Sequence, residues 1–254
     1  MGAGHAHALY VHEHSALHHA PPETKVAAVL LFALSVAVTP PRQVWAFAVY
    51  AVILAVALVV GRIPLRFFIL RLTGALPFIL LALMVPLVGS GERVDVGWVT
   101  VSRDGLWAAW GIIAKTTLGA GAAIVLVATT EVSRILEGLR TLKAPSVLVS
   151  IAGFMVRYLE LIADEMSRMR QAMVARGHDA RWLWQARPIA SASGALFVRA
   201  YERGERVHSA MMARGYTGEM PVLERRRATR TQWLVALVAP TVAVVVAVMA
   251  LVGS

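Results

Sequence analysis

Five long apolar runs constrain the fold of this chain more than any other feature of its sequence. The runs occupy about 24–39, 43–60, 65–88, 106–130 and 232–252. A helix needs roughly 20 apolar residues to cross a hydrocarbon core of about 30 Å. The chain is 58% hydrophobic with a mean hydropathy of +0.65, which is too apolar for a soluble domain of this size. The sequence therefore predicts an all-α, polytopic membrane protein with about five transmembrane helices.

Prolines mark the ends and interruptions of the first three runs. The first run is short and ends at Pro40-Pro41, so we expect a tight hairpin into the second run. The two runs are interpreted either as two full crossings or as one shallow hairpin. The third run contains Pro77 and Pro86, which a membrane helix tolerates only where its neighbours satisfy the freed carbonyls.

The distribution of Lys and Arg predicts the orientation of the chain. Seventeen of the 25 basic residues lie between Glu131 and Thr231, and positively charged segments are retained on the cytoplasmic side. We expect a protein of the cell (inner) membrane, with the N-terminus inside and the loop 89–105 outside. The predicted organisation is a His-rich cytoplasmic segment 1–23, transmembrane helices over 24–130, a cytoplasmic segment 131–231 and a C-terminal transmembrane helix 232–254.

The cytoplasmic segment is predicted to hold three helices, at about 131–142, 146–176 and 189–214, because Pro and Gly punctuate it between them. Apolar residues follow the second of these helices in steps of four and three, which draws one stripe along it. The third helix shows a comparable line. The two stripes consist of Met155, Leu159, Ile162, Met166, Met169 and Met173, and of Phe197, Tyr201, Gly204, His208 and Met211.

The second and third helices end in the same tripeptide, Ala175-Arg176-Gly177 and Ala213-Arg214-Gly215. Gly after the last helical residue is a common cap, and Arg at a helix C-terminus is electrostatically favourable. Each tripeptide alone is therefore an ordinary helix end. The repeated combination of a flexible Met stripe and a terminal guanidinium suits a groove on another protein, where Met adapts and Arg forms forked bonds to carboxylates.

These residues resemble the T component of energy-coupling factor (ECF) transporters, in its cobalt-type, CbiQ-like branch, over nearly the whole chain. The doubled Ala-Arg-Gly is the specific part of the resemblance. The supporting residues are Ser15, Leu17, His18, Pro22 and Lys25, Thr129-Thr130-Glu131, Pro145, Arg157-Tyr158, Glu165 and the run from Ala210 to Tyr216. The chain departs from the family pattern at Lys115, where Arg is more usual, and in its His-rich start.

The resemblance implies that the Ala-Arg-Gly helices are coupling helices, which cross one another and insert into grooves on two ABC-type ATPase subunits. Arg176 and Arg214 would pair there with acidic groups. It also implies a substrate-binding, CbiM-like membrane subunit as partner, with a small CbiN-like subunit as a further candidate. The expected function is to transmit ATPase movement to that subunit during cobalt uptake. T components for nickel or for a vitamin would carry the same coupling helices.

The motifs that are absent from the sequence exclude several classes of protein. There is no G-x-x-x-x-G-K-[ST] loop, so ATP is expected on partner subunits, and this chain is predicted to be a non-enzymatic permease subunit without a bound cofactor. Neither H-E-x-x-H nor G-x-S-x-G is present, which disfavours a membrane protease or esterase. A membrane-tethered regulator that binds nucleic acid is an alternative suggested by the net charge of +10, but cytoplasmic retention already accounts for that charge, and no nucleic acid is expected as partner.

Six of the eight histidines lie before residue 26, and His14 and His18 have the i,i+4 spacing of a helical chelate. The competing interpretation is a solvated tail, with His18 belonging only to the docking segment of the family. We expect no resident metal, with His14 and His18 as the only candidate ligands.

Lys115 lies well inside the fourth run, where an ionisable side chain is costly and faces protein or water. It is interpreted either as a residue of a substrate path or as a structural partner for a carbonyl freed by Pro77 or Pro86. The second interpretation is favoured, because a positive charge serves a cation path poorly.

Overall fold

The structure is a computed structural model that describes residues 15–88, 93–96, 99–177, 187–218 and 228–253. These residues form two compact units. The larger unit contains 15–142 and 228–253, and the smaller unit contains 143–218. Both units are helical, as the sequence predicts.

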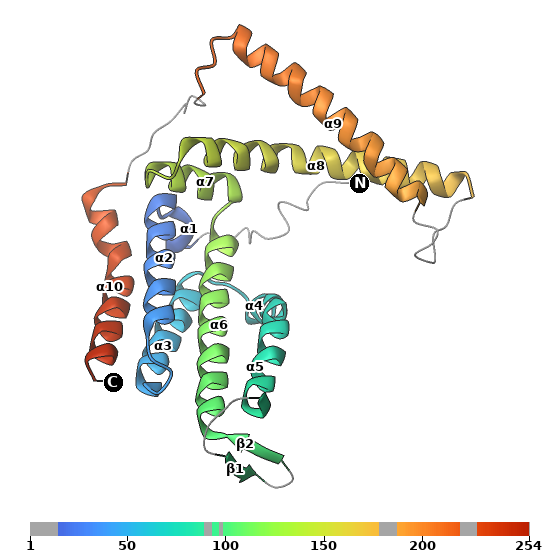
Figure 1. Ribbon diagram of the computed structural model, residues 1–254. Coiled ribbons are helices and arrows are strands. Elements are labelled where there is room, and N and C mark those ends of the chain that lie inside the picture. Colours follow the sequence, from blue (N-terminus) through green and yellow to red (C-terminus); the bar gives the residue numbers. More distant parts are fainter. Residues whose placement is uncertain (1–14, 89–92, 97–98, 178–186, 219–227, 254) are drawn as a thin grey trace. The chain divides into compact units, whose positions relative to one another are not determined.

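The larger unit is a bundle of helices with a small hairpin (Figure 1). Its helices are α1 (Ala16–His19), α2 (Pro22–Val38), α3 (Val44–Val60), α4 (Leu65–Leu72), α5 (Leu76–Val88), α6 (Arg103–Thr129), α7 (Val132–Thr141) and α10 (Arg230–Val252). Helix α2 packs against α10, α6 and α7, while α5 packs against α6. The strands β1 (Arg93–Val96) and β2 (Val99–Ser102) pair antiparallel between α5 and α6. This hairpin lies within the predicted external loop and was not expected from the sequence.

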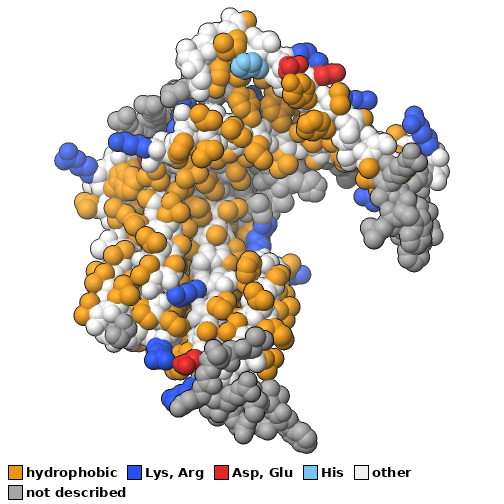
Figure 2. Space-filling view, in the orientation of Figure 1, with side chains coloured by type: hydrophobic (Ala, Val, Ile, Leu, Met, Phe, Trp, Pro, Cys, Tyr) orange, Lys and Arg blue, Asp and Glu red, His pale blue; other side chains and the backbone are white. Residues whose placement is uncertain are grey.

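Four helices in the described part of the chain are long and apolar enough to cross a membrane: Leu65–Leu87, α6, α10 and Ser146–Ala175. Helix α3 is a shorter apolar helix. Exposed side chains on the larger unit are largely hydrophobic, including Leu80, Leu81 and Val235. Hydrophobic side chains, in orange, cover much of the face shown in Figure 2. An apolar exterior of this extent requires lipid as the solvent, so the chain is a multi-pass membrane protein.

Helix Ser146–Ala175 was predicted to be cytoplasmic and nevertheless meets the length and hydropathy requirements of a span. Its apolar residues are concentrated before Arg157, whereas most of its charges follow that residue. Its assignment to the aqueous side therefore remains a prediction.

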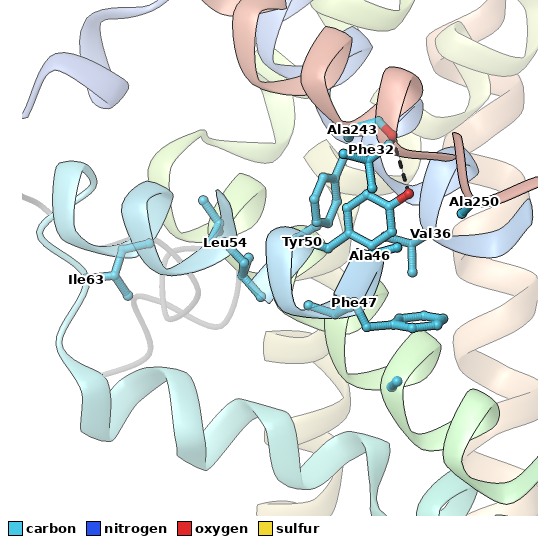
Figure 3. Close-up of a cluster of buried hydrophobic side chains, with 14 of the residues drawn as sticks. Phe32, Val36, Ala46, Phe47, Tyr50, Leu54, Ile63, Ala243 and Ala250 are labelled. Carbon is cyan, nitrogen blue, oxygen red and sulfur yellow. Dashed lines mark hydrogen bonds between the residues drawn. The ribbon is translucent and has the colours of Figure 1, made fainter. Parts of the chain in front are cut away.

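The core of the larger unit is centred on Tyr50, whose side chain is fully buried (Figure 3). Its hydroxyl donates to the Ala243 carbonyl at 3.3 Å and shares a hydrogen bond with the Thr39 hydroxyl at 2.8 Å. Phe32 and Phe47 pack edge-on against the Tyr50 ring. This cluster joins α2, α3 and α10 into one body.

The third apolar run is interrupted at Thr73–Ala75, which form a 3₁₀ turn between α4 and α5. Pro77 explains the interruption, because it has no N–H to donate to the Thr73 carbonyl four residues earlier. Pro86 lies inside α5 and is buried. Both prolines therefore lie in α5, Pro77 as its second residue and Pro86 in its interior.

Lys115 on α6 donates to the Ala37 carbonyl at 2.7 Å. The partner differs from the carbonyls near Pro77 or Pro86 that the sequence suggested. Residue 41, four positions after Ala37, is a proline and cannot complete the helical hydrogen bond. The ammonium therefore satisfies a terminal carbonyl of α2, where a positive charge also complements the helix dipole.

The smaller unit consists of two long helices, α8 (Ser146–Ala175) and α9 (Arg187–Ala213), which pack against each other. The predicted ranges, 146–176 and 189–214, agree with them within two residues. Helix α7 (Val132–Thr141), the first of the three predicted helices, belongs to the larger unit and packs on α2.

Candidate functional site

The ends of α8 and α9 are built in the same way. Gly177 and Gly215 have φ of +80° and +79°, and each donates its N–H to the carbonyl three residues earlier, Val174 or Met212, at 2.9 and 3.0 Å. At α9 the Tyr216 N–H also donates to the Met211 carbonyl, which completes a Schellman cap. A Cβ at either glycine would meet nothing within 4 Å. The backbone angle, and not lack of space, therefore favours glycine at both positions.

Arg176 and Arg214 are the capping residues of these two helices, and both side chains are exposed. Their backbone N–H groups still donate to carbonyls of the last turn, Met173 and Met211, at 3.1 and 3.0 Å. Each guanidinium is thus attached to a fixed backbone and projects from the end of a rigid helix. Their role in contacting a partner stays a prediction.

The predicted stripes divide into an exposed half and a packed half. Met155 on α8 and Phe197 on α9 are 67% and 71% exposed. Further along the stripes, Ile162, His208 and Met211 line a cavity of about 300 Å³ between the two helices. The stripes therefore serve both as a packing surface between α8 and α9 and as an exposed apolar surface.

A buried carboxylate holds α8 and α9 together where they pack. Glu165 on α8 accepts from Arg199 at 3.2 Å and from Arg203 at 3.4 Å, both on α9. In the sequence, Glu165 is singled out only by the family resemblance, and neither arginine was predicted to contact it. The i,i+4 spacing of Arg199 and Arg203 could have indicated an acidic partner. Two like charges on one helix face repel each other unless an anion lies beside them.

Residues distant in sequence meet at the end of the larger unit that carries α7. The Lys25 ammonium donates to the Thr129 carbonyl at 3.1 Å, the Thr130 hydroxyl at 2.9 Å and the His18 carbonyl at 3.5 Å. The His18 Nδ1 lies 2.8 Å from the Ser15 hydroxyl. Two groups of residues that the family resemblance singled out, one before the first apolar run (Ser15, His18 and Lys25) and one at the end of the fourth (Thr129-Thr130), therefore belong to one cluster. This cluster fastens the N-terminal segment and α2 to the end of α6.

Helix α7 contacts the start of α2 without an intervening side chain. A Cβ at Gly138 would lie 2.9 Å from the Pro22 carbonyl carbon and 3.0 Å from the Glu23 nitrogen. Glu23 itself is buried and accepts from the Ala228 N–H at 2.8 Å, just before α10 begins. The first turn of α2 thus connects α7 with the start of α10.

The predicted metal ligands are not brought together in the described residues. His18 is buried in the cluster beside Ser15, and His14 lies outside the described residues. No group of three or more His, Asp or Glu side chains suited to a metal occurs in the part of the chain that the structure describes. The His14–His18 chelate therefore stays a prediction.

The observations define a class of protein: a multi-pass helical membrane protein that also carries a pair of long helices, each ending in an exposed Arg followed by a Gly with positive φ. Comparison with known families makes this class specific. The family model for CbiQ, described as "Cobalt transport protein", matches residues 13–223. The chain belongs to the CbiQ family, and it is a transmembrane component of a transporter.

Individual relatives agree with this assignment. The chain is 31% identical over 196 residues to the cobalt transport protein CbiQ of Rhodobacter capsulatus, covering 77% of this chain and 78% of the relative. It is 26% identical over 223 residues to the energy-coupling factor transporter transmembrane protein EcfT of Listeria innocua, covering 82% and 83%. It is 24% identical over 206 residues to the putative fused cobalt transport protein CbiMQ of Methanocorpusculum labreanum, covering 77% of this chain and 34% of that protein.

Proposed function

We propose that this chain is the coupling subunit of an ATP-driven cobalt transporter, and that α8 and α9 transmit the movement of two ATPase subunits to a substrate-binding membrane subunit. The observation that carries the proposal is the pair of similar helix ends, each with an exposed Arg followed by a Gly cap. Two like ends suit two like grooves, one on each ATPase.

Arg176 and Arg214 are the residues assigned to the ATPase contact, within Ala175-Arg176-Gly177 and Ala213-Arg214-Gly215. A guanidinium forms two parallel hydrogen bonds to a carboxylate, so a docked arginine fixes both the position and the direction of its helix. The exposed apolar residues of the same helices, such as Met155, would fill the remainder of a groove. This chain supplies no phosphate-binding loop, and ATP would be bound and hydrolysed by the partners.

Mechanical transmission needs a stiff helix pair and a firm connection to the membrane helices. The pair is stiffened by Glu165, which links α8 to α9 through two arginines. The chain leaves α7 through Lys143 and enters α8 after Pro145, so the connection between the units is short. Packed helices move as rigid bodies, and a displacement of α8 and α9 would reach α7 through this connection.

Cobalt is proposed as the transported substrate and not as a cofactor of this chain. The support is the description of the CbiQ family and the name of the Rhodobacter capsulatus relative. A CbiM-like partner is supported by the name of the fused CbiMQ relative, and a small CbiN-like subunit is a further candidate. Substrate choice would belong to the CbiM-like subunit.

The location of α8 and α9 in the cytoplasm is part of the proposal and has its own test. The natural chain has no cysteine, so a single Arg168→Cys variant gives one labelling site. A membrane-impermeant maleimide should label it in inverted vesicles but not in intact cells. Labelling from the outside of intact cells would overturn the proposed orientation.

The coupling role is tested by co-purification of the ATPase subunits with Arg176→Ala, Arg214→Ala and the double variant. Breaking a buried charge pair costs about 2–5 kcal/mol, so each single variant should weaken ATPase association by roughly 30-fold or more. Matched controls are Arg168→Ala and Arg206→Ala, which remove an exposed arginine eight residues before each end. Normal ATPase recovery and cobalt uptake with the double variant would disprove the assigned role.

A further inference from the structure

A groove in the larger unit runs between α2, α3, α6 and α10 and encloses about 630 Å³. Its deepest lining residues, Phe32, Leu54 and Val125, are buried. Val60 and Val235 on its rim are exposed, so the groove opens beside α3 and α10. The volume is typical of a small-molecule site, and the lining is almost entirely apolar.

One end of the groove is polar and positively charged. Lys25, Thr129, Thr231 and Gln232 line this end, and no acidic residue lines the groove in the described part of the chain. Arg230, the first residue of α10, is exposed and directly precedes Thr231. The end thus combines the Lys25 ammonium and the neighbouring Arg230 with the start of α10, where the Glu23 carboxylate accepts from the Ala228 N–H at 2.8 Å. Two cations face one carboxylate there, so the end keeps a positive charge.

Among the described residues, the hydrogen bonds of Lys25 leave its charge without a counterion. Its ammonium donates only to neutral oxygens, those of His18, Thr129 and Thr130. No carboxylate pairs with it among the residues that the structure describes. A buried cation without an anionic partner is costly, and an anion placed within a few ångströms would stabilise it.

We propose that this groove binds an anionic phospholipid, with its phosphate at the Lys25–Arg230 end and the upper part of one acyl chain along the apolar floor. From Lys25 to Phe32 the groove follows α2 for about 10 Å, a third of a hydrocarbon core of about 30 Å. Basic pockets between membrane helices on the cytoplasmic side recognise anionic headgroups. The proposal rests on the groove and does not require coupling to an ATPase.

The test measures lipid retained by the full chain after incubation with vesicles of phosphatidylethanolamine and phosphatidylglycerol, followed by purification and native mass spectrometry. The unmodified chain should retain a single phosphatidylglycerol in preference to phosphatidylethanolamine. Ala57→Phe on α3 fills the groove and should reduce retention by about tenfold or more. Ala55→Phe changes an exposed residue of the same helix outside the groove and should retain lipid normally.

Two further variants separate loss of lipid from loss of fold. Ala236→Phe blocks the groove from α10, while Val238→Phe alters an exposed position of that helix and is its control. Arg230→Gln should keep lipid bound but reduce the preference for phosphatidylglycerol.

Equal retention of lipid by Ala57→Phe and Ala55→Phe, when both elute as folded protein, would overturn the proposal. Retention of phosphatidylglycerol and phosphatidylethanolamine in equal amounts by the unmodified chain would also overturn the proposal. Exclusion of lipid whenever another membrane subunit co-purifies would instead identify a protein occupant and also refute it.

Discussion

Replacement of Glu165 by Ala tests the link between α8 and α9 most directly. Glu165 is only 9% exposed and accepts hydrogen bonds from Arg199 and Arg203, whose side chains are 60% and 32% exposed. The Arg199 pair is largely screened by solvent and should contribute at most about 1 kcal/mol. The less exposed Arg203 pair is a charged hydrogen bond, typically worth about 1.5–3 kcal/mol. We expect Glu165→Ala to weaken the α8–α9 association by about 2–3 kcal/mol in total.

The expected loss can be measured by hydrogen–deuterium exchange on the full chain. An opening free energy lowered by about 2–3 kcal/mol raises the exchange rate of protected α9 amides by roughly 30- to 150-fold. Glu165→Gln keeps the volume and an acceptor and should have a smaller effect. Glu202→Ala, which removes an exposed carboxylate 3.9 Å from Arg206, is the matched control and should change little. Unchanged α9 exchange in Glu165→Ala would refute the assignment of Glu165 as the residue that joins the pair.

Two other substitutions test contacts within the larger unit, each read from the thermal unfolding midpoint of the purified chain. Gly138→Ala should destabilise the folded chain by about 1–3 kcal/mol, because its Cβ would meet the Pro22–Glu23 backbone. Gly153→Ala is the control: its Cβ meets nothing within 4 Å, and the change should be neutral or slightly stabilising. A neutral Gly138→Ala would contradict the close approach of α7 to α2. Lys115→Met should lower the free energy of unfolding by about 1–2 kcal/mol, because it leaves the Ala37 carbonyl at the end of α2 unpaired. Lys115→Arg should keep most of the stability, because its guanidinium can donate to the same carbonyl. Equal midpoints for Met and Arg at this position would show that the hydrogen bond does not matter.

The sequence predicted the helices well because long apolar runs and Pro or Gly punctuation are local signals. Helix α3 begins and ends within one residue of the predicted 43–60, and α6 was displaced by only a few residues from the predicted 106–130. The β-hairpin at 93–102 was missed, because its strands are short and stabilised by pairing with each other.

The contacts that build the candidate site were much harder to predict. The hydrogen bond from Lys25 to Thr130 joins residues more than 100 positions apart, and no local pattern specifies such a pair. The same limit applies to Lys115. Its place in an apolar run showed that it needs a hydrogen-bond partner, but nothing in the sequence identified the Ala37 carbonyl as that partner. The repeated Ala-Arg-Gly was visible in the sequence because its glycines have a local cause. Each glycine adopts the positive φ that ends its own helix, and this needs no contact with a distant residue.

The contact between Gly138 and the start of α2 has a mechanical consequence. Side chains between two helices act as a compliant layer, since rotamer changes absorb small shifts before the backbone moves. At Gly138 this layer is missing, and the α7 backbone lies against the peptide that joins Pro22 to Glu23. A shift of α7 toward α2 is therefore transmitted from backbone to backbone to the first turn of α2, and Glu23 passes that displacement on to the segment before α10.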